Sequence, residues 1–427
     1  MQRTKTSSST SLSFKIFVGM VIGVILGLLS VNFHFEQIIK DWIVPWGTIF
    51  LRLLKFVAVP LVIASLIKGI CGLKNVERLS RLGFKTLGIY IVTTVCAIII
   101  GISAVLLIKP GNFISDEKSA EFIQQYEQPA ATEASVSGNS VGPLQFIVDI
   151  VPENIISAAS NNSKMLQIIF IAIIFGIAII IIGEEKTKTF TKLIDDLNVI
   201  ILKIIDFIMV FAPIGVLALM AGLTVNYSGE ADVFKALGMY AATVIIALLF
   251  ISFVFYPILI KLFSKKKIGN FIKAMLPVQL LAFSTSSSAA TLPLTIESAE
   301  KNLGISNETA SFVLPVGVTI NMDGTSCYQA VAAIFMAQVL GLDLSFTQIL
   351  IIIATTTISS IGTPGIPGGS IVMLMIVLNS VGIPPEGLAL IMGVDRPLDM
   401  LRTVVNVTGD TTVACMMDNS KREMCDA

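Results

Sequence analysis

Residues 346–380 read FTQILIIIATTTISSIGTPGIPGGSIVMLMIVLNS, and this stretch decides the kind of fold that the chain adopts. Both ends are apolar, and the middle, residues 359–370, is rich in serine, glycine and proline and carries no charge. A helix needs roughly 20 apolar residues to cross a bilayer, so neither half crosses it alone. We therefore predict a re-entrant hairpin with its tip at membrane depth, and an ordinary loop between two helices is the alternative.

A second interrupted segment lies at 268–299, where the break is the polar run 284–288 (STSSS). Two interrupted segments in corresponding positions of a chain point to the binding site of a transporter. The loop alternative applies here too.

The remaining sequence is that of a membrane protein. The 427 residues are 54% hydrophobic and 14% charged, and the mean hydropathy is +0.86. The single histidine, His34, lies at the end of the first apolar run, which excludes Ser-His catalysis within the membrane and HExxH metal sites, and the five cysteines form no CxxC pair. We predict an all-α integral membrane protein with two hairpins and eight transmembrane helices, at 14–33, 43–72, 82–109, 142–183, 192–224, 233–263, 304–340 and 386–417.

The first apolar segment could be a signal peptide, but it is long and lacks an A-x-A site. Its glycines recur every fourth residue, at Gly19, Gly23 and Gly27, which is typical of a retained helix that packs closely on a neighbour. Lysine and arginine concentrate in alternate connections, so we expect both termini in the cytoplasm. The first hairpin then enters from inside and the second from outside.

The last apolar segment carries charges within the sequence GVDRPLDMLRTVVNVTGD, residues 393–410. A charge at the bilayer centre costs about 3 kcal/mol, so these residues need partners or ligands. One interpretation is a self-satisfied ion network that holds helices together. The other is a bound zwitterion with an extra carboxylate, in which Asp399 meets an ammonium group and Arg402 a carboxylate. Steps of three and four place six polar residues on one helix face: Asp395, Asp399, Arg402, Thr403, Asn406 and Asp410.

Two other polar clusters interrupt apolar sequence. Residues 319–325 read TINMDGT, where Gly324 permits local unwinding and Asp323 adds an anionic oxygen of the kind that hard cations select. Spacing alone does not distinguish sodium from a proton or calcium. Tyr90, Thr93 and Thr94 put three hydroxyls on one face of the third segment, where ordinary packing is the alternative role.

Together the NMDGT motif, the serine-rich hairpin, the Gly/Pro-rich hairpin and the DxxxDxxRTxxNVxGD pattern at 395–410 resemble the dicarboxylate/amino acid:cation symporter family. This family includes the excitatory amino acid transporters and archaeal aspartate transporters. The resemblance covers essentially the whole chain. It implies sodium-coupled inward transport of L-aspartate or L-glutamate by a non-enzymatic homotrimer in the plasma (inner) membrane, without nucleic acid or an organic cofactor.

The resemblance also implies an elevator-type transporter built from inverted repeats. A fixed scaffold would comprise 14–81 and 142–224. A mobile transport domain would comprise 82–110 and 225–427, with a cytoplasmic N-terminus at 1–13 and an external acidic loop at 111–141.

The site residues follow from the same resemblance. Substrate would be bound by Ser286, Ser287, Ser288, Thr325, Ile366, Asp399, Arg402, Thr403 and Asn406. Three sodium ions would be bound by Asp410 with Gly317, Asn321 and Asn406; by Thr319, Ser360, Ile361 and Thr363; and by Tyr90, Thr93, Thr94, Asn321 and Asp323, with Met322 inside the same motif.

The chain departs from the family pattern in its arginines. Archaeal relatives carry an arginine where this chain has Ser286, and eukaryotic relatives carry one at the position of Met400, so Arg396 is the candidate substitute. Gln329 stands where proton-coupled eukaryotic relatives have a glutamate, and we expect transport that is insensitive to pH. The rival functions are transport of C4-dicarboxylates or neutral amino acids, an ion channel, and an intramembrane enzyme.

Overall fold

The computed structural model describes residues 12–72, 81–114, 148, 151–160, 164–226, 231–264, 266–363, 365, 368–384 and 387–425. Every regular element in these ranges is helical, so the predicted all-α class is confirmed for this part of the chain. The expected acidic loop lies outside the described residues from position 115 onward. Five described stretches are long and apolar enough to cross a membrane: Phe14–Asn32, Glu36–Lys68, Lys85–Phe113, Glu185–Val225 and Asp232–Phe263.

The N-terminal helices pack through the predicted glycine stripe. Helix α1 (Leu12–Asn32) lies against α11 (Glu184–Asn226), and α3 (Val44–Gly72) follows the short α2 (Glu36–Ile38) and a π-helical turn (Ile39–Ile43). A Cβ atom added to Gly19 or Gly23 would lie 2.4 Å from a carbonyl oxygen of α11. The prediction of close backbone packing is therefore confirmed.

The fourth predicted helix differs from expectation. The region holds a separate short helix, α9 (Ile155–Ala159), and α10 begins only at Met165 and ends at Ile182. The Asn154 side chain accepts hydrogen bonds from two amides of α9 and so starts that helix on its own. Gly183, with a φ of +93°, then joins α10 to α11, which begins eight residues earlier than its apolar sequence indicates.

The predicted helix–break–helix pattern is confirmed at both hairpins. The first consists of α14 (Ile268–Thr285) and α15 (Ser288–Lys301), and the second of α18 (Phe346–Gly362) and α19 (Gly369–Ser380). Their tips meet, because the Ser287 hydroxyl and the Ala289 amide both donate to the carbonyl oxygen of Gly365, at 2.8 and 3.2 Å.

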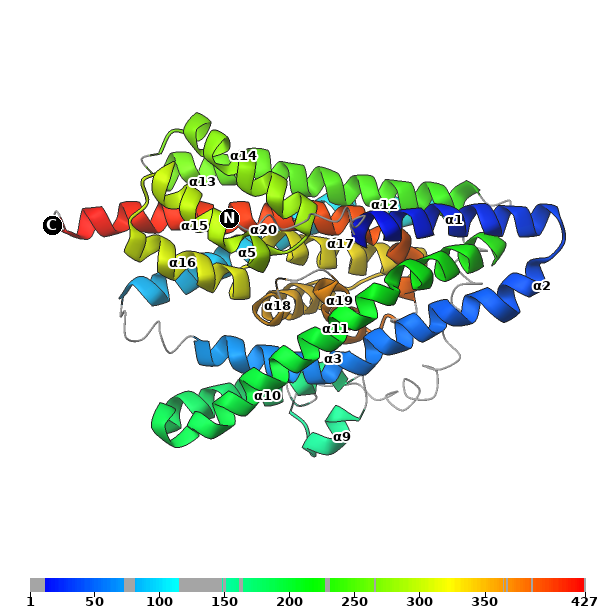
Figure 1. Cartoon of the computed structure of the whole chain (residues 1–427), viewed down its shortest axis with the longest axis horizontal. Helices are drawn as coiled ribbons and strands as arrows, with labels where there is room; N and C mark the ends of the chain where they lie inside the picture. Colours follow the sequence, from blue (N-terminus) through cyan, green and yellow to red (C-terminus); the bar gives the residue numbers. More distant parts are fainter. Residues whose placement is uncertain are drawn as a thin grey trace, which may run out of the picture.

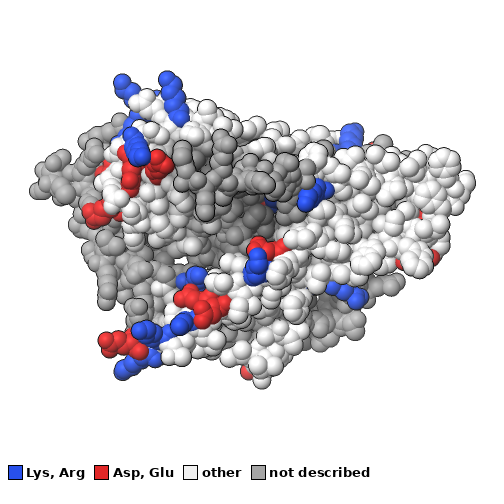
Figure 2. Space-filling view, in the orientation of Figure 1, with Lys and Arg blue, Asp and Glu red and all other residues white. Residues whose placement is uncertain are grey.

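The remaining helices of the described ranges complete the fold. They are α5 (Arg81–Ile108) with a 3-10 turn (Pro110–Phe113), α12 (Ala231–Phe250), a π-helical turn (Ile251–Phe255), α13 (Tyr256–Phe263), α16 (Asn307–Ile320), α17 (Asp323–Val339) and α20 (Leu388–Cys425). The α1–α2 turn lies at one end of the molecule and the C-terminus of α20 at the other (Figure 1). On the face in Figure 2, charged side chains gather toward the C-terminal end, and the opposite end is largely uncharged.

Candidate functional site

The polar face predicted for the last segment lies inside the protein. Helix α20 continues through Pro397, and its six polar residues have between 0 and 6% of their surface exposed. Charges buried this deeply require partners.

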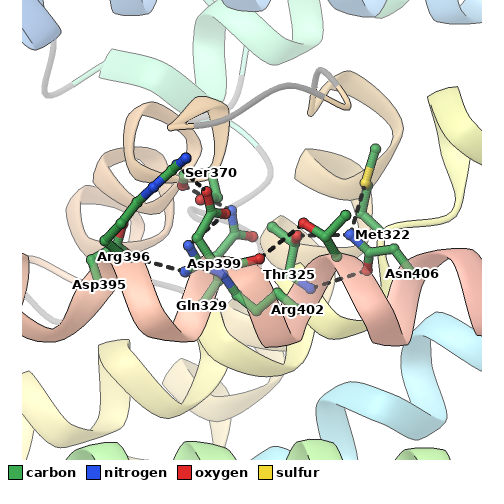
Figure 3. A network of polar contacts seen from close by, with 10 residues as sticks. Met322, Thr325, Gln329, Ser370, Asp395, Arg396, Asp399, Arg402 and Asn406 are labelled. Atoms are coloured by element: carbon green, nitrogen blue, oxygen red, sulfur yellow. Dashed lines mark hydrogen bonds and ion pairs between the residues drawn. The ribbon is translucent and has the colours of Figure 1, made fainter. Parts of the chain in front are cut away.

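Four charged side chains of α20 pair with one another (Figure 3). The guanidinium of Arg402 contacts Asp395 Oδ1 at 2.9 Å and Asp399 Oδ1 at 2.8 Å, and Arg396 contacts Asp399 Oδ2 at 2.9 Å. Arg402 also lies 3.8 Å above the ring of Tyr328, a cation–π contact that sequence reasoning missed. The self-satisfied ion network therefore describes the arrangement of these four residues in the structure.

A small pocket lies beside this network, between the two hairpin tips, α17 and α20. Its walls include six of the predicted substrate residues: Ser286, Ser288, Thr325, Asp399, Thr403 and Asn406. Met322, Thr363, Gly365 and Ser370 complete the described part of the lining. Ser287 instead binds the opposite hairpin, Arg402 faces its carboxylates, and Ile366 lies outside the described residues.

Asn406 ties α20 to the start of α17. Its Oδ1 accepts from the amides of Gly324 and Thr325, and its Nδ2 donates to the Thr325 hydroxyl. The predicted local unwinding within this motif is confirmed, but it lies at 321–322 and not at Gly324, which is in the first turn of α17. A Cβ there would lie 2.6 Å from the Arg402 carbonyl oxygen, so this glycine permits close packing on α20.

The first predicted sodium site is compact in the structure. Asn321 Nδ2 donates to Asp410 Oδ1 at 2.9 Å. A Cβ on Gly317 would lie 2.5 Å from the same Oδ1 and 2.6 Å from the Tyr90 hydroxyl, so only glycine leaves this space open. Asp410, Asn321, Gly317 and Tyr90 thus converge on one point.

The third predicted site adjoins it. Thr94 donates to Asp323 Oδ1 at 2.8 Å, and Thr93 donates to Asn321 Oδ1 at 3.3 Å. Tyr256, which sequence reasoning missed, donates to Asp323 Oδ2 at 2.9 Å. The only local signal was a tyrosine within an apolar segment, and the π-helical turn that precedes it could not be foreseen.

Three residues of the second predicted site lie at the edge of a cavity of about 590 Å³. Thr319, Ile361 and Thr363 line this cavity, which separates the hairpin tips and α16 from α3 and α11. The Ser360 hydroxyl donates to the Ile320 carbonyl and accepts from the Met322 amide, which joins hairpin two to the break in α16–α17.

Comparison with known proteins identifies the family of the chain. Residues 12–420 match the model of the sodium:dicarboxylate symporter family. The chain belongs to this family. It is 36% identical to the proton/glutamate-aspartate symporter of Escherichia coli over 94% of this chain and 90% of the relative. It is 36% identical to the proton/sodium-glutamate symport protein of Bacillus subtilis (98% and 93%), and 34% identical to excitatory amino acid transporter 1 of Ambystoma tigrinum (95% and 82%).

A member of a symporter family needs binding sites for its substrate and ions rather than a catalytic centre. Asp323 and Asp410 have at most 1% of their surface exposed, and their partners in the described residues are hydroxyl and amide groups rather than cations. Buried carboxylates are stable as anions only beside a positive charge. The oxygen-rich surroundings of both residues therefore fit a hard cation such as sodium.

Proposed function

We propose that this chain is a secondary active symporter that couples the inward movement of sodium ions to the uptake of L-aspartate or L-glutamate. The observation that carries the proposal is the combination of two features at α20 and the start of α17. One is a pocket with an aspartate and an arginine beside it, and the other is a pair of buried carboxylates, Asp323 and Asp410, without basic partners among the described residues. The names of the relatives support the same function.

In the pocket, Asp399 would hold the substrate ammonium and Arg402 its side-chain carboxylate. Asn406 and the backbone of residues 286–288 would hold the main carboxylate. Thr325, Thr403 and Ile366 would complete the contacts. This assignment places an anionic group beside an ammonium and a planar guanidinium beside a carboxylate.

Three sodium ions would travel with each substrate. One would bind Asp410 with the carbonyls of Gly317, Asn321 and Asn406, and one would bind Asp323 with Tyr90, Thr93, Thr94 and Asn321. The third would bind the carbonyls of Thr319, Ser360, Ile361 and Thr363. These sets offer mainly oxygen ligands, which sodium prefers over nitrogen and sulfur.

The molecule would act as a homotrimer in the inner membrane, with eight transmembrane helices, two re-entrant hairpins and both termini in the cytoplasm. Helices α1, α3, α10 and α11 would form the scaffold. The hairpins with α5, α12, α13, α16, α17 and α20 would form a transport domain that slides as an elevator. The cavity between these two groups supports this division, because a moving interface is expected to pack loosely.

A proton-coupled symporter is the second candidate, favoured by the name of the E. coli relative. A proton could also neutralise a buried carboxylate. Against it, the residue beside the pocket is Gln329, an amide that does not titrate, and the single histidine lies far from this segment in the sequence.

Uptake into proteoliposomes tests the choice of ion. We expect L-aspartate or L-glutamate uptake that requires a sodium gradient, with a Hill slope for sodium above one. Asp410→Asn should lower the apparent sodium affinity much more than it changes substrate selectivity. Asp206→Asn, at an exposed aspartate of α11, is the matched control. Uptake driven by a proton gradient alone, without sodium, would favour the second candidate.

A further inference from the structure

The helix that runs from α12 into α13 changes its buried face at the π-helical turn Ile251–Phe255. Before the turn, buried side chains recur every three or four residues, as in a regular helix: Val233, Ala236, Tyr240, Val244, Ala247 and Ile251. Continued unchanged, this spacing would turn Ile258 and Leu262 inward. These two side chains are instead 49% and 67% exposed, whereas Tyr256 and Ile260 are fully buried. The turn therefore shifts the buried face along the sequence and brings the Tyr256 side chain into the protein.

The hydroxyl of Tyr256 reaches the carboxylate of Asp323. It donates to Oδ2 at 2.9 Å, and the hydroxyl of Thr94, on α5, donates to Oδ1 at 2.8 Å. A carboxylate has about four acceptor sites, so one donor on each oxygen fixes its orientation and leaves acceptor sites for a cation.

The surroundings of the Tyr256 hydroxyl favour this contact over any other. Its second acceptor, the carbonyl oxygen of Val405 on α20, lies farther away, at 3.3 Å, and carries no charge. The single hydroxyl proton forms the stronger hydrogen bond with the carboxylate. Gly409 leaves room for this bond, because a Cβ atom there would lie 2.5 Å from the Tyr256 hydroxyl oxygen and 3.0 Å from Asp323 Oδ2.

We propose that Tyr256 is a positioning residue of a sodium site at Asp323, and that the π-helical turn before it places it there. The inference rests on the proposed function, which assigns a sodium ion to Asp323. Tyr256 acts through the carboxylate, which it holds in the orientation that the ion requires. Hydrogen-bond partners of metal ligands typically contribute about 10–100-fold to metal affinity, and π-helical turns are frequent at functional sites.

Sodium binding to the purified full-length protein without substrate tests this role. The dependence of the unfolding temperature on sodium concentration gives an apparent sodium dissociation constant, because a ligand of the folded state stabilises it. Choline chloride keeps the ionic strength constant. Tyr256→Phe removes only the hydroxyl and should raise this constant by about 10–100-fold. A merely structural role would lower the unfolding temperature and leave the sodium constant unchanged.

Binding of L-aspartate gives a second measurement. The sodium concentration that Tyr256→Phe requires for L-aspartate binding should rise in the same direction. At saturating sodium the affinity for L-aspartate should match that of the parent, because the ion site is then filled in both proteins.

Tyr240→Phe is the matched control. Tyr240 lies on the buried face of α12, is as fully buried as Tyr256, and its hydroxyl has no hydrogen-bond partner among the described residues. This variant should keep the sodium constant of the parent. An unchanged sodium constant in Tyr256→Phe, or an equal loss in both tyrosine variants, would overturn the inference. A parent protein whose unfolding temperature and L-aspartate binding do not respond to sodium would instead overturn the proposed function.

Discussion

Arg402 has no exposed surface, and its guanidinium contacts two carboxylates and the face of Tyr328. These contacts fix where a positive charge stands beside the pocket before substrate arrives. A preformed charge of this kind lowers the conformational cost of binding. The chemistry of single side chains therefore decides which ligand the pocket accepts.

Replacing Arg402 with cysteine should abolish binding of L-aspartate and L-glutamate. The substrate carboxylate would then be buried without a partner, which costs about 2–5 kcal/mol, or roughly 30-fold to several-thousand-fold in affinity. L-serine or L-alanine should become the preferred ligand, measured by binding in sodium. Retained sodium binding in the same variant shows that the protein is folded. Unchanged affinity for L-aspartate would contradict the substrate assignment.

Gln329 is a second residue beside the pocket whose replacement should change transport. It is fully buried, and its Nε2 donates to the Ser370 carbonyl at 3.2 Å beside the pocket. Gln329→Glu should make uptake dependent on pH. A protonated glutamic acid can donate as the amide does, whereas the ionised form buries a new negative charge, so uptake should fall as pH rises.

The parent protein is the control for this variant. Its sodium-driven uptake should be nearly flat between about pH 6 and 8, the interval in which histidine and few other side chains titrate. Equal pH profiles of the parent and the variant would contradict the prediction.

Helices meet in this protein where small residues or breaks let their backbones approach. The α1–α11 contact depends on the glycines of α1, and the hairpin tips meet where helical geometry ends. Such contacts are fixed by backbone atoms, which cannot move aside as flexible side chains do. Substitution at these points is therefore more disruptive than the small size of the residues indicates.

Gly23→Val should destabilise the protein by about 1–3 kcal/mol or more, because the new side chain would press on the Leu217 carbonyl oxygen, 2.4 Å from the added Cβ. Thermal unfolding of the purified protein measures this. Gly88→Val is the matched control, since nothing lies within 4 Å of a Cβ there. A similar loss in both variants would indicate a general cost of replacing glycine.

The sequence predicted the elements whose signals are local. Runs of serine, glycine and proline located both hairpins, and the glycine period located the close packing of α1. The break at 321–322 was assigned to Gly324 instead, because neither Asn321 nor Met322 is a helix breaker and the deviation depends on contacts with α20 and hairpin two. Helix α11 also begins earlier than predicted, at Glu184, because its first turns are polar and precede its apolar sequence.

At the site, residue types alone indicated which side chains carry charge, but not which of them pair. Asp395–Arg402 joins residues seven positions apart, and Arg396–Asp399 joins residues three positions apart. Tyr256 and Tyr328 were missed because tyrosine in an apolar helix is usually a packing residue.

At the scale of the whole molecule, the hairpin tips lie next to helices that we assign to the scaffold. A Cβ on Gly362, at the end of α18, would lie 2.9 Å from Leu66 Cγ on α3. A cavity of about 590 Å³ lies beside this contact, and Ile67 and Gly362 are among its lining residues. A sliding transport domain would have to break this contact in every cycle.

Cysteines at positions 66 and 362, introduced as Leu66→Cys and Gly362→Cys in a background without the five native cysteines, should form a disulfide on oxidation. The sulfur of the cysteine at position 66 would lie about where Leu66 Cγ lies now, which suits disulfide geometry. The bond should stop uptake in proteoliposomes, and a reducing agent should restore it. The two single variants are controls, and full uptake after complete cross-linking would contradict the sliding motion.

The contact between the hairpin tips bears on whether transport can proceed in both directions. Two donors of the first hairpin share one acceptor, the Gly365 carbonyl, so lifting either hairpin forfeits both hydrogen bonds. At about 1 kcal/mol each, the two hydrogen bonds favour contact between the tips over their separation by roughly 30-fold. Loss of the two hydrogen bonds costs the same free energy whichever hairpin moves away. This contact therefore favours neither import nor export. The direction of net transport is then set by the sodium and substrate concentrations on the two sides of the membrane. Transport would reverse when these gradients are inverted.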